Sequence, residues 1–270
     1  MNALVWYVIM KWMPKGSSCV DFVTQRSLYE VRKRPSKSYS WVAFMLANIC
    51  AELPWNTLMS VFIFFGWYYP IGLYHNAEPT GAVTERGALL FLLIWSFVMF
   101  TSTFTHMIIA SVDVAENGGN IATLQFSLTI LFCGVLVSPS KLPGFWIFMY
   151  RVSPFTYLVD AMLSVSLANA LAFCSSVEVS VFDPPSGQTC GQYLSACTSI
   201  AGGSLSDVNA TSQCEFCAIM DTNAFLSQVN SYYDHRWRNF GLMWAYVAFN
   251  VCAALFPYWF GRVPKSAKKN

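Results

Sequence analysis

The sequence predicts an all-α integral membrane protein with four transmembrane helices, a re-entrant hairpin and a large disulfide-containing external loop. Charged residues make up 11% of the 270 residues, against roughly 25% in typical globular proteins, and 55% of the chain is hydrophobic. A soluble fold of this size would need more charge to cover its surface. The net charge of only +2 argues against a nucleic-acid partner.

Four segments have the length that a bilayer core of about 30 Å requires of a helix. They are residues 41–70, 87–112, 117–140 and 239–261. Three of them contain no Asp, Glu, Lys or Arg, whereas 41–70 carries Glu52 and Pro54. We therefore expect four crossings.

The apolar stretch 142–177 differs from the four spans because charges and prolines interrupt it. Arg151 and Asp160 divide it, and Pro143 and Pro154 break helical hydrogen bonding. An uninterrupted crossing would put both charges deep in lipid, which costs several kcal/mol. We expect a re-entrant or interfacial hairpin here, the alternative being a fifth full crossing.

The distribution of Lys and Arg predicts the orientation of the chain. Residues 26–37 hold five Lys or Arg, and the last nine residues hold four. Both clusters are expected in the cytoplasm, which requires an even number of crossings. The region 141–238 is then re-entrant or external, and the sequon at Asn209 is a glycosylation candidate on that side.

Five of the nine cysteines fall within this external region, where an oxidising compartment would allow disulfides. The candidates are Cys174, Cys190, Cys197, Cys214 and Cys217. Cys214 and Cys217 also have the spacing of a metal-binding pair. Because no second pair stands at zinc spacing, the sequence favours disulfides and predicts no metal site.

No motif for catalysis or nucleotide binding occurs in the sequence: G-x-x-x-x-G-K-[ST], H-E-x-x-H and G-x-S-x-G are all absent. For His106, inside a span, a helix-packing hydrogen bond is favoured over metal ligation. The intramembrane carboxylate Glu52 fits a proton or cation relay, but the sequence favours a structural pair with a neighbouring helix.

The span 117–140 carries polar groups beside aromatic ones, which fits helix packing or the wall of a path for amphipathic ligands. The residues concerned are Thr123, Gln125, Phe126, Ser127, Thr129, Phe132 and Cys133. Periodicity alone favours packing.

Several longer motifs resemble the second membrane domain of pleiotropic-drug-resistance ABC transporters, the full-size G-type exporters. They are Phe22–Lys37, Trp67–Gly72, Glu85–Gly87, Phe132–Val135, Phe145–Tyr157, Pro184–Gly191, Arg236–Gly241 and Trp259–Lys265. The resemblance runs from about Phe22 to the end of the chain.

The resemblance implies an ABC-2-type membrane domain over 41–262, preceded by a cytoplasmic amphipathic connecting helix at 22–40 and followed by a basic cytoplasmic tail at 263–270. Residues 1–21 stand unmatched where the family has two further helices. Three groups of candidate residues follow from the resemblance. They are a substrate path (Thr123, Gln125, Phe126, Thr129, Phe132, Cys133), a coupling helix that contacts a nucleotide-binding domain (Arg26, Tyr29, Glu30, Arg32, Arg34) and an external gate (Arg151, Pro154, Phe155).

The function implied is that of a membrane-domain fragment of an ATP-driven exporter of amphipathic drugs, xenobiotics or lipids. The chain is not expected to be an enzyme or to bind a cofactor, because ATP and Mg²⁺ belong to nucleotide-binding domains that it lacks. Its expected partners are those domains, the first membrane domain, the bilayer and hydrophobic small molecules. The expected location is the plasma membrane, with several crossings and both termini cytoplasmic. The alternative is a non-transporting membrane protein that pairs with full-length transporters.

Overall fold

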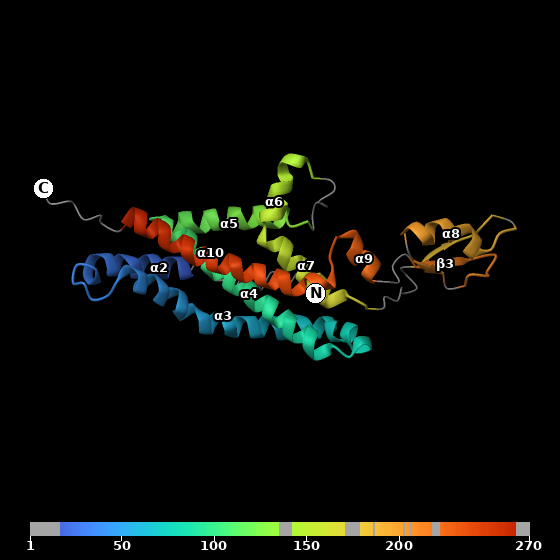
Figure 1. Cartoon of the computed structure of the whole chain (residues 1–270), viewed down its shortest axis with the longest axis horizontal. Coiled ribbons are helices and arrows are strands. Elements are labelled where there is room, and N and C mark those ends of the chain that lie inside the picture. Colours follow the sequence, from blue (N-terminus) through green and yellow to red (C-terminus); the bar gives the residue numbers. More distant parts are fainter. Residues whose placement is uncertain are drawn as a thin grey trace. The chain divides into compact units, whose positions relative to one another are not determined.

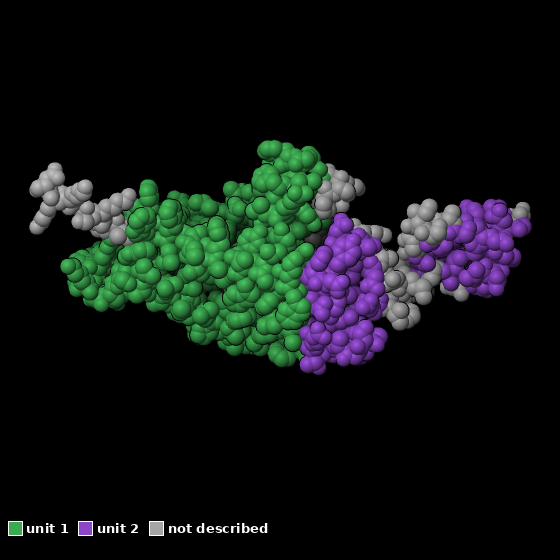
Figure 2. All heavy atoms as spheres, in the orientation of Figure 1, with its two compact units in different colours: residues 1–71, 88–159, 237–270 green, residues 72–87, 160–236 purple. Residues whose placement is uncertain are grey.

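The computed structural model describes residues 17–134, 142–170, 179–185, 187–201, 203–205, 207–217 and 222–262, and most of them are helical (Figure 1). The chain divides into two compact units, drawn in different colours in Figure 2. One comprises residues 1–71, 88–159 and 237–270, and the other comprises 72–87 and 160–236.

Three helices are long and apolar enough to cross a membrane among the described residues. They are α3 (Trp41–Ile71), α4 (Val83–Ser111) and α10 (Arg236–Arg262), the last continuous with the 3₁₀ turn η5 (Tyr233–His235). The stretches 41–70, 87–112 and 239–261, predicted as spans, thus form long apolar helices. Pro54 lies inside α3 without ending it, as transmembrane helices tolerate when neighbouring groups satisfy the freed backbone.

The fourth predicted span differs from the sequence expectation. Helix α5 (Ala115–Leu131) is 17 residues long and ends well before Ser140. After it, Gly134 has φ +90°, and a Cβ at this position would lie 2.8 Å from the ring of Tyr150. The left-handed backbone and the close ring explain why the chain turns away there. Residues 135–140 of the expected span lie outside the described residues.

The stretch expected to form a hairpin consists of short helices. The 3₁₀ turn η4 (Gly144–Trp146) leads into α6 (Ile147–Val152), and α7 (Pro154–Leu167) follows after Ser153. Ser153 is extended, and the Thr156 hydroxyl donates to the Tyr150 carbonyl across the break. Within residues 142–170 no single helix is long enough to cross a bilayer, as the break at Pro154 led us to expect.

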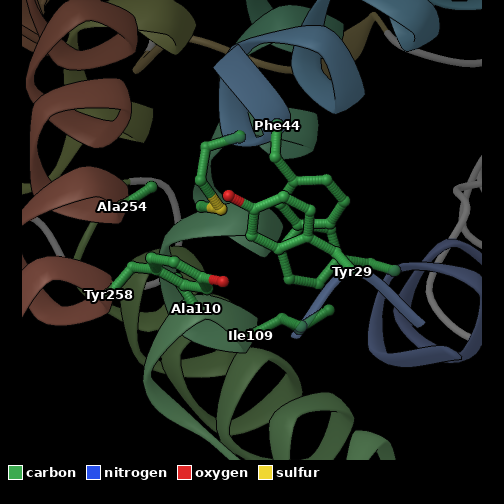
Figure 3. Close-up of a cluster of buried hydrophobic side chains, with 8 residues drawn as sticks. Tyr29, Phe44, Ile109, Ala110, Ala254 and Tyr258 are labelled. Atoms are coloured by element: carbon green, nitrogen blue, oxygen red, sulfur yellow. The ribbon is translucent and has the colours of Figure 1, made fainter. Parts of the chain in front are cut away.

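The main core of the first unit joins the short helix α2 (Ser17–Leu28) and the π-helical turn η1 (Tyr29–Lys33) to three long helices. Figure 3 shows Tyr29, Phe44, Ile109, Ala254 and Tyr258 pointing into one cluster. The rings of Tyr29 and Phe44 stack with centroids 4.5 Å apart. Because these side chains come from η1, α3, α4 and α10, the cluster fixes the short helix to the ends of the long ones.

The second unit contains a small sheet and several short helices. Strands β1 (Ser180–Phe182), β3 (Cys214–Cys217) and β2 (Ser204–Leu205) pair antiparallel in the order β1-β3-β2, with Val181 opposite Glu215 and Leu205 opposite Phe216. The remaining elements are η2 (Leu73–Thr80), α8 (Cys190–Ala201) and α9 (Thr222–Gln228). The Thr222 hydroxyl lies within hydrogen-bond distance of the carbonyls of Leu167 and Ala170, and so holds the start of α9 to the end of α7.

Candidate functional site

Arg26, on α2, is the charged residue that binds this helix to the rest of its unit. Its side chain is 3% exposed, and its guanidinium donates to the carbonyls of Ile109 and Val112 at 2.9 Å and to that of Asp113 at 3.2 Å. These carbonyls stand at the C-terminal end of α4, where helical carbonyls lack partners and a cation is favoured. Arg26 therefore caps α4 from another helix.

A second set of polar contacts connects η1 to the end of α10. Tyr258 donates to Glu30 Oε1 at 3.2 Å, and Arg262 lies 3.6 Å from the same carboxylate. Arg262 also pairs with Asp113, just before α5, while Arg34 donates to the Arg262 carbonyl. The end of α10, the α4–α5 junction and the turn after α2 thus share one network.

Burial changes the acidity of two side chains in this region. Desolvation lowers the pKa of the Arg26 guanidinium below its usual value, and the positive charge of Arg262 lowers it further. Burial likewise raises the pKa of Tyr29 above 10. The Tyr29 hydroxyl donates to the Tyr39 carbonyl at 3.2 Å, so the neutral phenol has a defined partner.

The five candidate coupling residues therefore face in different directions. Arg26 and Tyr29 point inward, Glu30 and Arg34 are partly buried, and Arg32 is exposed. The exposed side of this helix also carries Leu28 and Val31, which are 47% and 74% exposed. A contact with another domain would therefore involve Arg32 with these apolar side chains, and not Arg26 or Tyr29.

Glu52 lies on α3 opposite a polar site on α4. Ser102 donates to Glu52 Oε2, and Glu52 Oε1 lies 3.2 Å from His106 Nε2. Ser102 and His106 are 5% and 4% exposed. Among the described residues the two ring nitrogens of His106 make no hydrogen bond of good geometry, so its contact with Glu52 is one of proximity. Glu52 thus lies beside polar side chains of a neighbouring helix, and Ser102 is a partner that the sequence did not indicate.

The six substrate-path candidates on and after α5 do not share one exposed face. Thr123 and Gln125 are exposed, whereas Phe126 and Cys133 are buried and Thr129 and Phe132 are half-buried. Phe126 makes edge-to-face contacts with Phe104 and Phe155, and the ring of Phe132 stacks on Trp146.

The exposed face of α5 mixes apolar and polar groups. The residues exposed there, besides Thr123 and Gln125, are Glu116, Asn117, Asn120, Ile121, Leu124, Ser127 and Leu131. The Thr123 and Ser127 hydroxyls each donate to the carbonyl four residues earlier, at 2.9 and 2.8 Å. The donor of each hydroxyl is thus satisfied within the helix, while its oxygen can still accept a hydrogen bond.

The three gate candidates lie at the break between α6 and α7. Arg151 is exposed, and its carbonyl accepts a hydrogen bond from the Tyr157 hydroxyl at 2.7 Å. Pro154 begins α7 and is buried, and the ring of Phe155 is packed edge-to-face against Phe97 and Phe126. Phe155 thus connects α7 to α5.

Cysteines stabilise the small sheet of the second unit. A disulfide joins Cys190, at the start of α8, to Cys214 on β3, and Cys217 is also disulfide-bonded. Disulfide bonding in this region is therefore confirmed. Cys174 and the side chain of Cys197 lie outside the described residues. Asn209 is exposed, and its backbone amide donates to the Asp207 carboxylate at 2.9 Å.

Sequence reasoning missed a cluster of arginines in the second unit. Arg86 is 5% exposed, donates to the Ala168 carbonyl at 2.6 Å and lies 5.1 Å from the Tyr233 ring centroid. Arg236 lies 3.9 Å from the same ring and 3.5 Å from Glu85. The sequence did contain a signal for this cluster. Arg86 and Arg236 each lie just before an expected span, and charged residues at such positions must find partners near the membrane surface.

Together, the long apolar helices, the short helix α2 whose Arg26 caps α4, and the polar pair between α3 and α4 define a helical membrane domain. The ABC-2 type transporter family matches residues 2–167, and the family described as CDR ABC transporter matches residues 217–268. The chain belongs to the ABC-2 type transporter family. This confirms the resemblance to pleiotropic-drug-resistance transporters; the first match also covers residues 2–21, to which that resemblance did not extend.

Curated fungal relatives align along most of the chain. It is 63% identical over 250 residues to the ABC-type transporter eriD of Hericium erinaceus and 63% identical over 248 residues to ABC multidrug transporter C of Aspergillus fumigatus. It is 58% identical over 249 residues to ABC multidrug transporter AFR2 of Cryptococcus neoformans var. grubii. Each alignment covers 92% of this chain but only 16–17% of the relative, so the chain spans about a sixth of the length of these proteins.

Proposed function

We propose that this chain supplies part of the membrane path of an ATP-driven exporter of amphipathic small molecules. The observation that carries the proposal is the position of Arg26, which holds α2 to the last carbonyls of α4 directly before α5 begins. A displacement of α2 is thereby passed to α5. Because the chain belongs to the ABC-2 type transporter family, we assign this movement a role in transport.

The mechanism we propose begins outside the membrane domain. ATP hydrolysis on a nucleotide-binding domain moves the exposed side of α2 and η1, where Leu28, Val31 and Arg32 are available for contact. The buried side transmits the movement through Arg26 to the α4–α5 junction and through Glu30 to the end of α10. Alternating access then arises as these helices shift between two packed arrangements.

In this proposal α5 forms one wall of the substrate path. Thr123 and Gln125 meet the substrate, because they are exposed and offer hydrogen-bonding atoms among apolar side chains. Phe126, Thr129, Phe132 and Cys133 act by holding α5 in place. At the other end of α5, Phe126 and Phe155 transmit the movement to the break at Pro154, which serves as the external gate with Arg151.

The membrane topology belongs to the same proposal. Four crossings, the fourth beginning with α5, place residues 22–40 and the basic tail 263–270 in the cytoplasm of a multi-pass plasma-membrane protein. The break between α6 and α7 is re-entrant, and the disulfide-bonded sheet with Asn209 is external. The Lys and Arg clusters at both ends of the chain support this orientation.

A chimeric transporter tests the proposed function. The aligned segment of ABC multidrug transporter C is replaced by this chain, and energy-dependent rhodamine 6G efflux is measured in yeast lacking its own drug exporters. We expect vanadate-sensitive efflux from the chimera and none from this chain expressed alone. A chimera that reaches the plasma membrane at normal levels but exports nothing would contradict the proposal; binding of the chain to intact transporters without efflux would favour the modulator alternative.

Substitutions on α5 then test the substrate path. Thr123→Val and Gln125→Leu should change the ratio of resistance to different drugs by roughly threefold to tenfold, the effect of one hydrogen bond. Ser111→Ala is the matched control, because it removes an exposed hydroxyl bonded to the carbonyl four residues earlier on α4. If Ser111→Ala changes the drug profile as much as Thr123→Val does, the exposed face of α5 is not the path.

A further inference from the structure

The turn that follows η1 displays a serine directly after two basic residues. Lys33, Arg34, Pro35 and Ser36 are consecutive, and residues 35–40 are all exposed. Helical structure stops at Lys33, and the backbone continues as a turn through Lys37, which has φ 52°. Ser36 is therefore presented outside the helix and ahead of the first membrane-spanning residue of α3.

We propose that Ser36 is a phosphorylation site for a serine/threonine kinase that recognises basic residues on the amino-terminal side of its target. Lys33 and Arg34 stand three and two residues before Ser36, where their positive charges can meet acidic side chains of such a kinase. The Ser36 hydroxyl donates to the Lys33 carbonyl at 2.9 Å and lies 2.8 Å from Ser38 Oγ, both exposed contacts that are easily replaced. Pro35 cannot extend the helix over the serine.

The reaction uses ATP as the phosphoryl donor. Ser36 Oγ attacks the γ-phosphorus, a new O–P bond forms, and the bond to the β-phosphate oxygen breaks to release ADP. The hydroxyl proton passes to the catalytic base of the kinase. The product is a phosphoserine that carries about −1.5 to −2 charges at neutral pH.

The phosphate changes the contacts of Arg34. Arg34 Nη1 donates to the Arg262 carbonyl at the end of α10, a neutral acceptor. A phosphate two residues away offers charged oxygens to the same guanidinium, and arginine binds phosphate more strongly than a carbonyl. Phosphorylation therefore draws Arg34 away from α10 and loosens the last turn of that helix. This regulation goes beyond the proposed transport route, and its chemistry does not depend on it.

Phosphorylation of the purified full chain in nanodiscs tests the site. The chain is incubated with ATP and the catalytic subunit of cAMP-dependent protein kinase, and phosphopeptides are mapped by mass spectrometry. We expect phosphate on Ser36, its loss in Ser36→Ala and its retention in Ser38→Ala, the matched control on the same turn. Lys33→Ala should lower the initial rate about tenfold, as expected for the loss of one charge-assisted contact. Absence of phosphate from Ser36 in the folded chain would overturn the proposal.

Hydrogen exchange tests the consequence for α10. Phosphorylated protein should exchange the amides of residues 258–262 faster than unmodified protein, and Arg34→Ala without phosphate should give the same increase. Arg32→Ala is the control, because Arg32 is an exposed arginine two residues earlier, on η1. Unchanged exchange after complete phosphorylation would overturn the proposed transfer of Arg34 from the carbonyl to the phosphate, independently of any transport assay.

Discussion

Glu30 accepts a hydrogen bond from the Tyr258 hydroxyl at 3.2 Å, although 228 residues separate them in the sequence. The contact joins the turn after α2 to the last turns of α10, where Arg262 adds an ion pair to the same carboxylate. A short helix before the first described span is thus fastened to the end of the last one. Movement at either end of this pair must alter the other, because the side chains between them are buried.

Removal of the Arg26 side chain should destabilise the first unit strongly. Arg26→Ala deletes three hydrogen bonds and leaves the carbonyls at the end of α4 without this partner, a loss of about 2–4 kcal/mol in the free energy of unfolding. The measurement is unfolding in detergent followed by tryptophan fluorescence. Arg32→Ala, at an exposed position, should change stability by about 0.5 kcal/mol or less. Equal effects of the two substitutions would show that Arg26 is not the cap described above.

A double-mutant cycle should reveal coupling between Glu52 and His106. With Glu52→Gln, His106→Gln and the double variant, we expect a coupling energy of about 0.5–1.5 kcal/mol, the usual range for polar pairs between membrane helices. Glu52→Gln keeps an acceptor for Ser102, so the cycle reports mainly on the contact between Glu52 and His106. A coupling energy of zero would mean that the two side chains are neighbours without a stabilising interaction.

Tyr29 should make stability fall at alkaline pH. Because burial raises the pKa of Tyr29 above 10, the folded state holds the phenol proton more tightly than the unfolded state does. Its contribution to stability is complete below the unfolded pKa of about 10 and is lost as pH rises through the folded pKa. Tyr29→Phe should therefore flatten the decline in unfolding midpoint above about pH 10.

The control for this pH dependence is Tyr193→Phe, which removes a hydroxyl from an exposed ring on α8. Wild type and Tyr193→Phe should lose stability in parallel as the pH is raised, with Tyr29→Phe less steep than both. Three parallel curves would show that Tyr29 ionises equally easily in the folded and unfolded states.

The disulfide between Cys190 and Cys214 should stabilise the small sheet by roughly 3 kcal/mol. This is the free energy expected when a closed loop of this length reduces the conformational entropy of the unfolded chain. The double variant Cys190→Ala/Cys214→Ala should therefore be cut faster by protease between residues 187 and 217. Cys50→Ala, which removes a free and exposed cysteine, should leave the cleavage rate unchanged. Identical cleavage of the wild type and the double variant would rule out a stabilising role for the bridge.

Glycosylation at Asn209 provides a test of the external placement of the sheet. Asn209→Gln and Thr211→Ala should both abolish an endoglycosidase-sensitive mass shift, whereas Thr211→Ser keeps the sequon and should keep the shift. The measurement is gel mobility of the full chain expressed in yeast. Persistence of the shift in Asn209→Gln would assign the glycan to another site.

Local sequence predicted the long helices but not the full extent of α5. Long apolar stretches, free of charge at 87–112 and 239–261 and interrupted by Glu52 at 41–70, sufficed to predict α3, α4 and α10, since lipid accepts only long apolar helices. The same rule extended α5 to residue 140, although the helix ends at Leu131. The end is set by Gly134, whose left-handed backbone lies against Tyr150, and such a contact between distant residues leaves no trace in a hydropathy pattern.

The sequence predicted which residues belong to the candidate site, but not which of their side chains are buried and which are exposed. Motif resemblance identified Arg26 and Arg32 as members of one amphipathic helix, without indicating which of them turns inward. Arg26 is buried because three carbonyls at the end of α4 accept hydrogen bonds from it, and Arg32 is exposed because its side of the helix meets no such acceptors among the described residues. Likewise, Glu52 was a recognisable intramembrane carboxylate, but Ser102 became its partner only through the packing of α3 on α4.

Composition, span length and motif therefore determined by themselves that this chain is a helical membrane domain of the ABC-2 type, because the bilayer restricts both the length and the polarity of what can cross it. Tertiary structure alone decided that α2 is fastened to the ends of α4 and α10 and which side chains of α5 remain exposed. A charge can be buried only where other helices supply hydrogen-bond acceptors. The positions of those acceptors depend on how the helices pack, which the sequence of a single helix does not reveal.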